Sequence, residues 1–119
     1  MTALHTTENI AREAVDAARA GEKVAIFADT VNAAQSFAAH AFETVRPEDH
    51  ADVRRTNGNA HIHFPAGGSV YFRSLRHSGR GLSLDRAYVP AAIEHSDAEA
   101  VAPCLATSEN PQMIGYFPR

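Results

Sequence analysis

The sequence predicts an α/β fold, a three-layer sandwich around a mostly parallel, mixed sheet that contains one β-hairpin. The first observation is a short apolar run, Val24–Ala28, placed between two amphipathic helical patterns, which is typical of a covered βα unit. The second is a pair of alternating apolar segments around Ala66-Gly67-Gly68, which indicates a hairpin. The third is a short strand, residues 86–89, stopped by Pro90, because proline cannot donate to a central ladder.

Capping residues and spacing define the other elements in chain order. Thr6 or Thr7 precedes a helical pattern that Gly21 ends, and Asp29 and Thr30 are suited to cap the next helix. The expected elements are a helix over residues 7–20, a helix from 30 to about 45, a short strand over 53–56, hairpin arms over 60–64 and 69–73, a helix from Ser96 to about Ala106 that contains Pro103, and a last strand over 112–117.

Length and composition indicate one ordinary globular domain, residues 1–119. Forty-five per cent of the residues are hydrophobic, which is enough for a core without metals or disulfides. The single cysteine, Cys104, excludes an internal disulfide and fits a reducing compartment. The first residues lack the pattern of a signal peptide, and no apolar run approaches membrane-spanning length. We therefore expect a cytoplasmic protein, in a bacterial host cell, without a membrane partner.

Charge is unevenly distributed along the chain. The formal net charge is −3, which argues against a protein that grips nucleic acid with its whole surface. Between residues 54 and 86, however, arginines are frequent and Asp85 is the one acid. Guanidinium groups bind phosphate oxygens well, so a weak nucleic-acid site is one interpretation and a solvated loop is the other. The residues of this site would be Arg54, Arg55, Arg73, Arg76 and Arg80.

His61 and His63 are two residues apart on a predicted strand and therefore share a face. Two imidazoles could contribute to a metal site, but a third and fourth ligand are needed. His77 and His95 are present, yet no spacing ties them to the pair. We expect no metal and a solvated or packing role for both side chains.

Residues 80–91 resemble a motif of the large-subunit ATPase of phage DNA-packaging terminases, within the helicase-like P-loop nucleotidases. Arg80, Gly81 and Asp85 match, and residues 87–89 supply the apolar strand. In that family two acidic residues follow. The first holds the magnesium ion, and the second prepares the water that attacks the γ-phosphate. Here these positions are Pro90 and Ala91. The resemblance therefore implies a degenerate site without nucleotide cofactor or hydrolysis.

The order of the other segments supports the same resemblance. Residues 21–30 look like the family's second strand and following turn, residues 61–72 like its hairpin, and residues 110–118 like its coupling-motif strand with Phe117 in place of the usual Thr or Ser. The residues before the first helix include neither Gly nor Lys, so the phosphate-binding loop and its strand are missing. The resemblance implies a truncated P-loop NTPase-like fold.

The missing strand has a structural consequence within this resemblance. The family places the coupling-motif strand beside the phosphate-loop strand, so the last strand here would have an open edge that must be covered or paired. We expect a homodimer, or a heterologous partner, at this edge, with Pro111 and Pro118 limiting its length. The interface residues would be Gln112, Met113, Ile114, Gly115, Tyr116 and Phe117.

Three functions are compatible with these observations. The first is a non-enzymatic, phage- or prophage-derived interaction module that binds an unidentified protein. The second is a nucleic-acid-binding accessory of DNA packaging or replication that uses the basic loop. The third is a small enzyme with unrelated chemistry that uses the histidines with Asp85 or Glu94, although no nucleophile, base and orienting residue can be assembled from the sequence.

Overall fold

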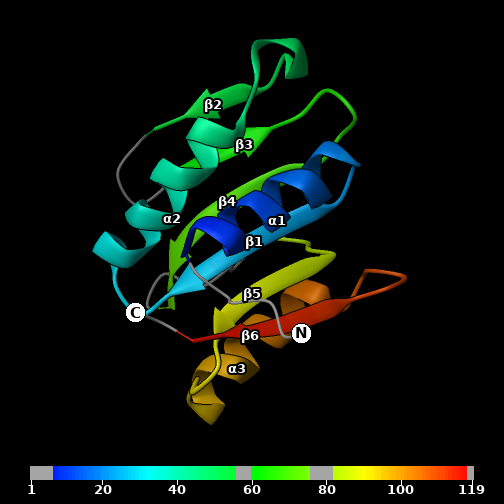
Figure 1. The fold of residues 1–119 in the computed structure, drawn as a ribbon. Coiled ribbons are helices and arrows are strands. Elements are labelled where there is room, and N and C mark those ends of the chain that lie inside the picture. The colour runs from blue at the N-terminus through cyan, green and yellow to red at the C-terminus, as the bar shows by residue number, and fades with distance from the viewer. Residues whose placement is uncertain (1–6, 56–59, 76–81, 118–119) are drawn as a thin grey trace, which may run out of the picture.

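A computed structural model describes residues 7–55, 60–75 and 82–117. Six strands form one sheet in the order β2-β3-β4-β1-β5-β6 (Figure 1). Strand β1 is parallel to β4 and β5, β6 is parallel to β5, and β3 is antiparallel to β2 and β4. The elements are α1 (Thr7–Arg19), β1 (Lys23–Ala28), α2 (Val31–Thr44), the 3₁₀ turn η1 (Pro47–Asp49), β2 (Asp52–Arg54), β3 (His61–His63), β4 (Ser69–Ser74), β5 (Arg86–Pro90), α3 (His95–Val101), the 3₁₀ turn η3 (Ala102–Leu105) and β6 (Gln112–Tyr116).

Helices cover both faces of the sheet, as the sequence predicts. Helices α1 and α2 lie on one face, and α3 lies across the sheet from them, near β5 and β6 and far from β2 and β3 (Figure 1). Strand β1 is in contact with both helical layers: Val24 and Ile26 join the core under α1 and α2, whereas Ala25 and Phe27 join the core under α3 and η3. A strand buried on both faces must be apolar throughout, which explains the uninterrupted run. The fold is therefore the predicted three-layer sandwich.

The predicted signals at the ends of α1 and α2 are confirmed. The Thr30 hydroxyl accepts a hydrogen bond from the Ala33 N–H at 3.1 Å, which satisfies one of the free donors at the start of α2. Gly21 follows α1 with a φ of 107°, a conformation that glycine adopts without steric cost. The two helices approach closely because their facing sides consist largely of buried alanines.

Helix α3 differs from the prediction. The sequence predicts a helix from Ser96 to about Ala106, but α3 begins at His95, after Glu94 as the N-cap residue, and its α-helical part ends at Val101. The chain continues as the 3₁₀ turn η3 to Leu105. Pro103 is the physical reason, because it has no N–H to donate to the preceding helical turn.

The hairpin of β3 and β4 has the predicted pairing. Its turn contains Gly67, with a φ of 95°, and the Phe64 N–H donates to the Gly68 carbonyl at 2.8 Å. Gly68 lies against the end of α1, since a Cβ at this position would be only 1.8 Å from the Ala18 carbonyl oxygen. Gly68 is therefore required for close packing against α1, whereas Gly67 is the glycine that the turn favours.

An ion pair connects η1 to α1. The Arg19 guanidinium donates to both carboxylate oxygens of Asp49, at 2.9 Å and 3.0 Å, and the Arg46 N–H donates to the same carboxylate at 2.9 Å. The hydrogen bond from Arg19 is the main reason that the pKa of Asp49 falls to about 2. Arg19 also contacts the exposed Asp16 at 2.6 Å.

The ion pair predicts a pH dependence of stability. Because the folded pKa of Asp49 lies below its ordinary value of 3.8, its contribution is complete above that pH and is lost as the pH falls toward about 2. Asp49→Asn should therefore lower the free energy of unfolding at neutral pH and have little effect near pH 2. Urea titrations at both pH values measure this, with Asp16→Asn as the matched control on the exposed side of Arg19. An equal loss at both pH values would contradict the assignment.

Candidate functional site

The carboxyl ends of β1, β4, β5 and β6 meet at one edge of the sheet, because these strands are parallel. Ligands of open α/β sheets bind at this edge. Strand β1 leads here to the exposed Asp29 and Thr30, and β5 leads to the buried Pro90 and the exposed Ala91. Pro90 and Ala91 have no ionisable group, so neither side chain can bind a metal.

Tyr116 fills the space beside the end of β5. Its hydroxyl donates to the Phe27 carbonyl at 2.6 Å, beyond the last residue pair between β1 and β5, Ile26 and Tyr88. Its ring packs edge-on against Phe37 of α2, with ring centroids 5.1 Å apart. Burial raises the pKa of Tyr116, and the charge of Asp29 raises it further. The buried Tyr116 side chain thus seals this part of the carboxyl edge, between the ends of β1 and β5.

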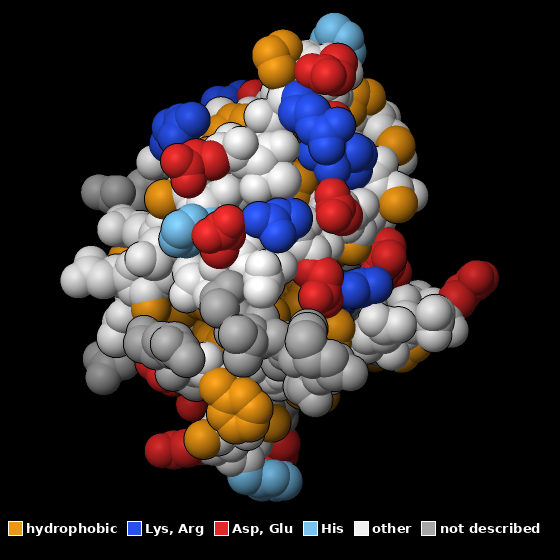
Figure 2. Space-filling view, in the orientation of Figure 1, with side chains coloured by type: hydrophobic (Ala, Val, Ile, Leu, Met, Phe, Trp, Pro, Cys, Tyr) orange, Lys and Arg blue, Asp and Glu red, His pale blue; other side chains and the backbone are white. Residues whose placement is uncertain are grey.

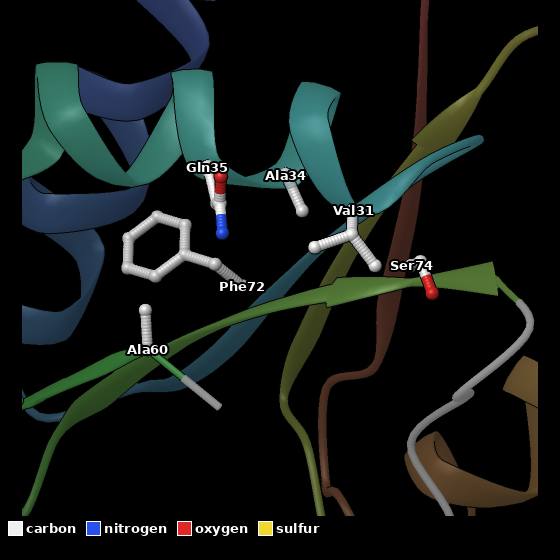
Figure 3. Close-up of a pocket in the computed structure, with 6 residues that line it drawn as sticks. All are labelled: Val31, Ala34, Gln35, Ala60, Phe72 and Ser74. Carbon is white, nitrogen blue, oxygen red and sulfur yellow. The ribbon is translucent and has the colours of Figure 1, made fainter. Parts of the chain in front are cut away.

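A small cavity lies under the first turn of α2, close to the carboxyl end of β4. Figure 3 shows the side chain of Gln35 and the ring of Phe72 on its walls. Its volume is about 10 Å³, which is room for about one water molecule, so it cannot hold a nucleotide. It is lined by Val31, Ala34, Gln35, Ala60, Phe72 and Ser74.

Asp85 lies at the opposite, amino edge of the sheet. Its carboxylate accepts hydrogen bonds from the Lys23 N–H at 2.9 Å and from the Ser108 hydroxyl at 2.8 Å. The bond from Lys23 is the main cause of a lowered pKa for Asp85. Glu94, the alternative acid of the third, enzymatic hypothesis, follows the other end of β5. The His61–His63 pair of that hypothesis lies on β3, which pairs with β2 and β4 and not with β5.

A polar network that sequence reasoning missed lies next to Asp85, and two of its members, Glu22 and Arg86, line an open groove of about 600 Å³. The Arg86 guanidinium donates to Glu22 at 3.2 Å and 3.3 Å and to the Tyr88 hydroxyl at 3.2 Å. That hydroxyl in turn donates to Glu13 of α1 at 2.9 Å. Arg86 lies in the strand that the sequence predicts over residues 86–89, and it connects β5 to α1. No local sequence pattern marks the distant acids as its partners.

The predicted arginines do not all lie on one face. Arg54 lies on β2, with its Nε 3.4 Å from Asp52, whereas the guanidinium of Arg55 lies over the ring of Phe42 of α2, at 4.4 Å. Arg73 lies over the ring of Tyr71, at 5.7 Å, on β4. Arg76 and Arg80 are outside the described residues. On the face covered by α1 and α2, basic and acidic side chains are interspersed (Figure 2).

His61 and His63 share a face of β3, as predicted, with ring centroids 4.8 Å apart. Among residues 7–55, 60–75 and 82–117, no group of three or more His, Cys, Asp or Glu side chains is placed to hold a metal. The same residues contain no helix with the length and apolarity that crossing a membrane requires.

Strand β6 is an edge strand of the sheet. The Gln112 N–H donates to Asp85 and the Tyr116 carbonyl accepts from Ala91, so the even-numbered residues of β6 bond to β5. Peptide groups alternate along a strand, and those of Met113 and Gly115 therefore face the open edge. The side chain of Met113 is 40% exposed and that of Phe117 is 72% exposed, so this edge is apolar as well as unpaired in the described chain.

Comparison with known proteins identifies one fold. The chain is similar to a solved mutant of the large terminase ATPase domain of Thermus Phage P74-26, with a TM-score of 0.67 and 20% sequence identity. The match covers 95% of this chain and 55% of that chain, so this chain spans about half the length of that domain. No protein-family model and no curated protein matches the sequence.

The likeness confirms the terminase-like fold that the motif order predicts. At this identity it shows the fold alone, and the activity of a shared fold does not transfer with it. Function must therefore be argued from the edges and faces of this sheet.

Tyr116→Phe tests the seal at the carboxyl edge. Removing the hydroxyl leaves the buried Phe27 carbonyl without this donor, so the free energy of unfolding should fall by about 1–3 kcal/mol. Tyr71→Phe is the matched control, because Tyr71 is only partly buried on β4 and should lose much less. Denaturant unfolding of both variants measures the difference, and equal losses would contradict a special role for the Tyr116 hydroxyl.

Proposed function

We propose that the protein is a phage- or prophage-derived, terminase-like module that binds a partner protein through β6 and does not hydrolyse nucleotide. The observation that supports the proposal best is the edge position of β6, with outward peptide groups and the exposed apolar side chains of Met113 and Phe117. An edge of this kind favours pairing with another strand.

The arrangement at the end of β5 supports the absence of hydrolysis. Phosphoryl transfer depends on a phosphate clamp and a metal that are positioned together. Pro90 and Ala91 provide no carboxylate for the metal, and the Tyr116 hydroxyl and ring occupy the neighbouring space. The residues of this edge therefore stabilise the fold and do not form a nucleotide site.

A second copy of the chain is the partner that fits this edge most simply. Two β6 strands related by a two-fold axis would pair antiparallel and extend the sheet across both molecules. Pro111 and Pro118 lack an N–H, so pairing is limited to the residues between them. Such an interface would also bring the exposed Met113 and Phe117 side chains of both copies together.

Nucleotide should have no effect on the isolated protein. With ATP and Mg²⁺ we expect no release of phosphate and no rise in the melting temperature, because a ligand that binds the folded state must stabilise it. Phosphate release and thermal unfolding with and without nucleotide measure this. A melting temperature that rises with ATP concentration would contradict the proposal.

Met113→Pro should dissociate the dimer. The substitution removes an outward N–H and leaves the bonds to β5 intact, so it costs about 1 kcal/mol per protomer. For the symmetric pair, about 2 kcal/mol corresponds to a roughly 30-fold weaker Kd. Met113→Ala is the control, since it shortens the same side chain but keeps the N–H. Light scattering over a concentration series gives the Kd, and circular dichroism checks that each variant is folded.

Two results would contradict pairing through β6. One is a chain that stays monomeric at high concentration. The other is an equal change in Kd for Met113→Pro and Met113→Ala, which would mean that the peptide group at this position makes no intermolecular hydrogen bond.

A further inference from the structure

Among the described residues, no helix covers most of the face of β2, β3 and β4 that lies opposite α1 and α2. The apolar residues of the α3 layer pack on β1 and β5, through Ala25, Phe27, Ala87 and Val89, and no residue of β2 or β3 belongs to that core. Tyr71 of β4 is partly buried at its margin. In Figure 1, α3 lies at the end of the sheet away from β2 and β3.

Three aromatic side chains stand together on this face. His61 is directly opposite Tyr71 in the β3–β4 ladder, and alternation along β3 brings His63 to the same side. The ring centroids are 4.8 Å apart for the two histidines and 5.8 Å apart from each histidine to Tyr71. His63 is exposed, and the other two are partly exposed. We call His61, His63 and Tyr71 the ring cluster.

Guanidinium groups lie on two sides of the ring cluster. Arg54 is directly opposite His61 in the β2–β3 ladder, and the Arg73 guanidinium carbon is 5.7 Å from the centroid of the Tyr71 ring. Arg54 is paired with Asp52, but both side chains are about 60% exposed, and an exposed pair of this kind is worth little. Its guanidinium can therefore turn to a phosphate at small cost.

We propose that this face binds single-stranded nucleic acid, with unpaired bases stacked on the ring cluster and phosphates held by Arg54 and Arg73. Exposed aromatic rings on an open sheet stack two or three bases in other single-strand-binding folds, and flanking arginines add contacts to the backbone. Burial lowers the pKa of His63, and His61 lowers it further, which favours a neutral ring suited to stacking.

The same geometry disfavours double-stranded DNA and a protein partner. Bases within a duplex cannot stack on rings at the surface of a sheet, because their faces are already stacked on one another. Polar and charged side chains occupy this face beside the rings, with Asp52 opposite His63 and Ser69 also in the row. A stable protein interface would need an apolar centre, whereas rings between guanidiniums match the alternation of bases and phosphates.

The test is the anisotropy of fluorescent oligothymidylate and oligouridylate titrated with the full chain at two salt concentrations. We expect weak binding that salt weakens further. Tyr71→Ala and His63→Ala should each reduce affinity at least about fivefold through lost stacking. Arg54→Gln should weaken binding to both probes and lower the slope of log Kd against log salt by about 0.7, the value for one phosphate contact on a single strand.

Arg55→Gln is the matched control, because it removes the same charge from the neighbouring residue on the helix side, over Phe42. It should change the Kd less than twofold. Asp52→Asn, which removes the one acid opposite the rings in the β2–β3 ladder, should increase affinity. The proposal would be overturned by no binding at low salt, by equal effects of Arg54→Gln and Arg55→Gln, or by a matched duplex that binds as tightly as the single strands. Binding confined to one of the two probes would support it and would show which of the two single strands the face prefers.

Discussion

The arrangement of the sheet depends on Asp85, which holds three strands together at one point. Its backbone N–H donates to the Lys23 carbonyl and its carbonyl accepts from the Gln112 N–H, while its carboxylate accepts from the Lys23 N–H and the Ser108 hydroxyl. One residue thus fixes the starts of β1, β5 and β6 relative to one another. Because the side-chain period of a strand is two, a slip of one residue would move every side chain to the other face of the sheet. The hydrogen bonds of Asp85 fix the register against that slip.

Much of the fold follows from local signals that agree with one another. The unbroken apolar β1, the Thr30 cap, the turn at Gly67 and the stop at Pro90 each specify an element through nearby backbone chemistry. These signals depend only on residues close in the chain, which is why they can be read without a structure. The exception is α3, where Pro103 converts the second half of the expected helix into a 3₁₀ turn.

The sites were harder to predict, because they depend on contacts between distant residues. The Tyr116 hydroxyl reaches the Phe27 carbonyl 89 positions away, and Arg86 reaches Glu22 across 64 positions. The predicted nucleic-acid site contains five arginines because they are close in sequence. Alternation along the chain places Arg54 and Arg55 on opposite faces of the sheet instead. The sequence predicts the part of the ring cluster formed by His61 and His63, because alternation places them on one face. Tyr71 joins them only through the register of the hairpin, which the sequence pattern does not specify.

The two edges of the sheet differ, and this difference limits the kind of assembly that the protein can form. Strand β2 spans only Asp52 to Arg54, and both of these charged residues are exposed, so it resists pairing in the way that natural edge strands commonly do. Strand β6 is longer and apolar. A molecule that can pair through both edges of its sheet can add further copies indefinitely and form a fibre. A molecule that can pair through one edge only forms a dimer. If copies pair through β6 as proposed, the short charged β2 at the far side of the sheet would stop further growth, and an uncharged, lengthened β2 would remove that protection.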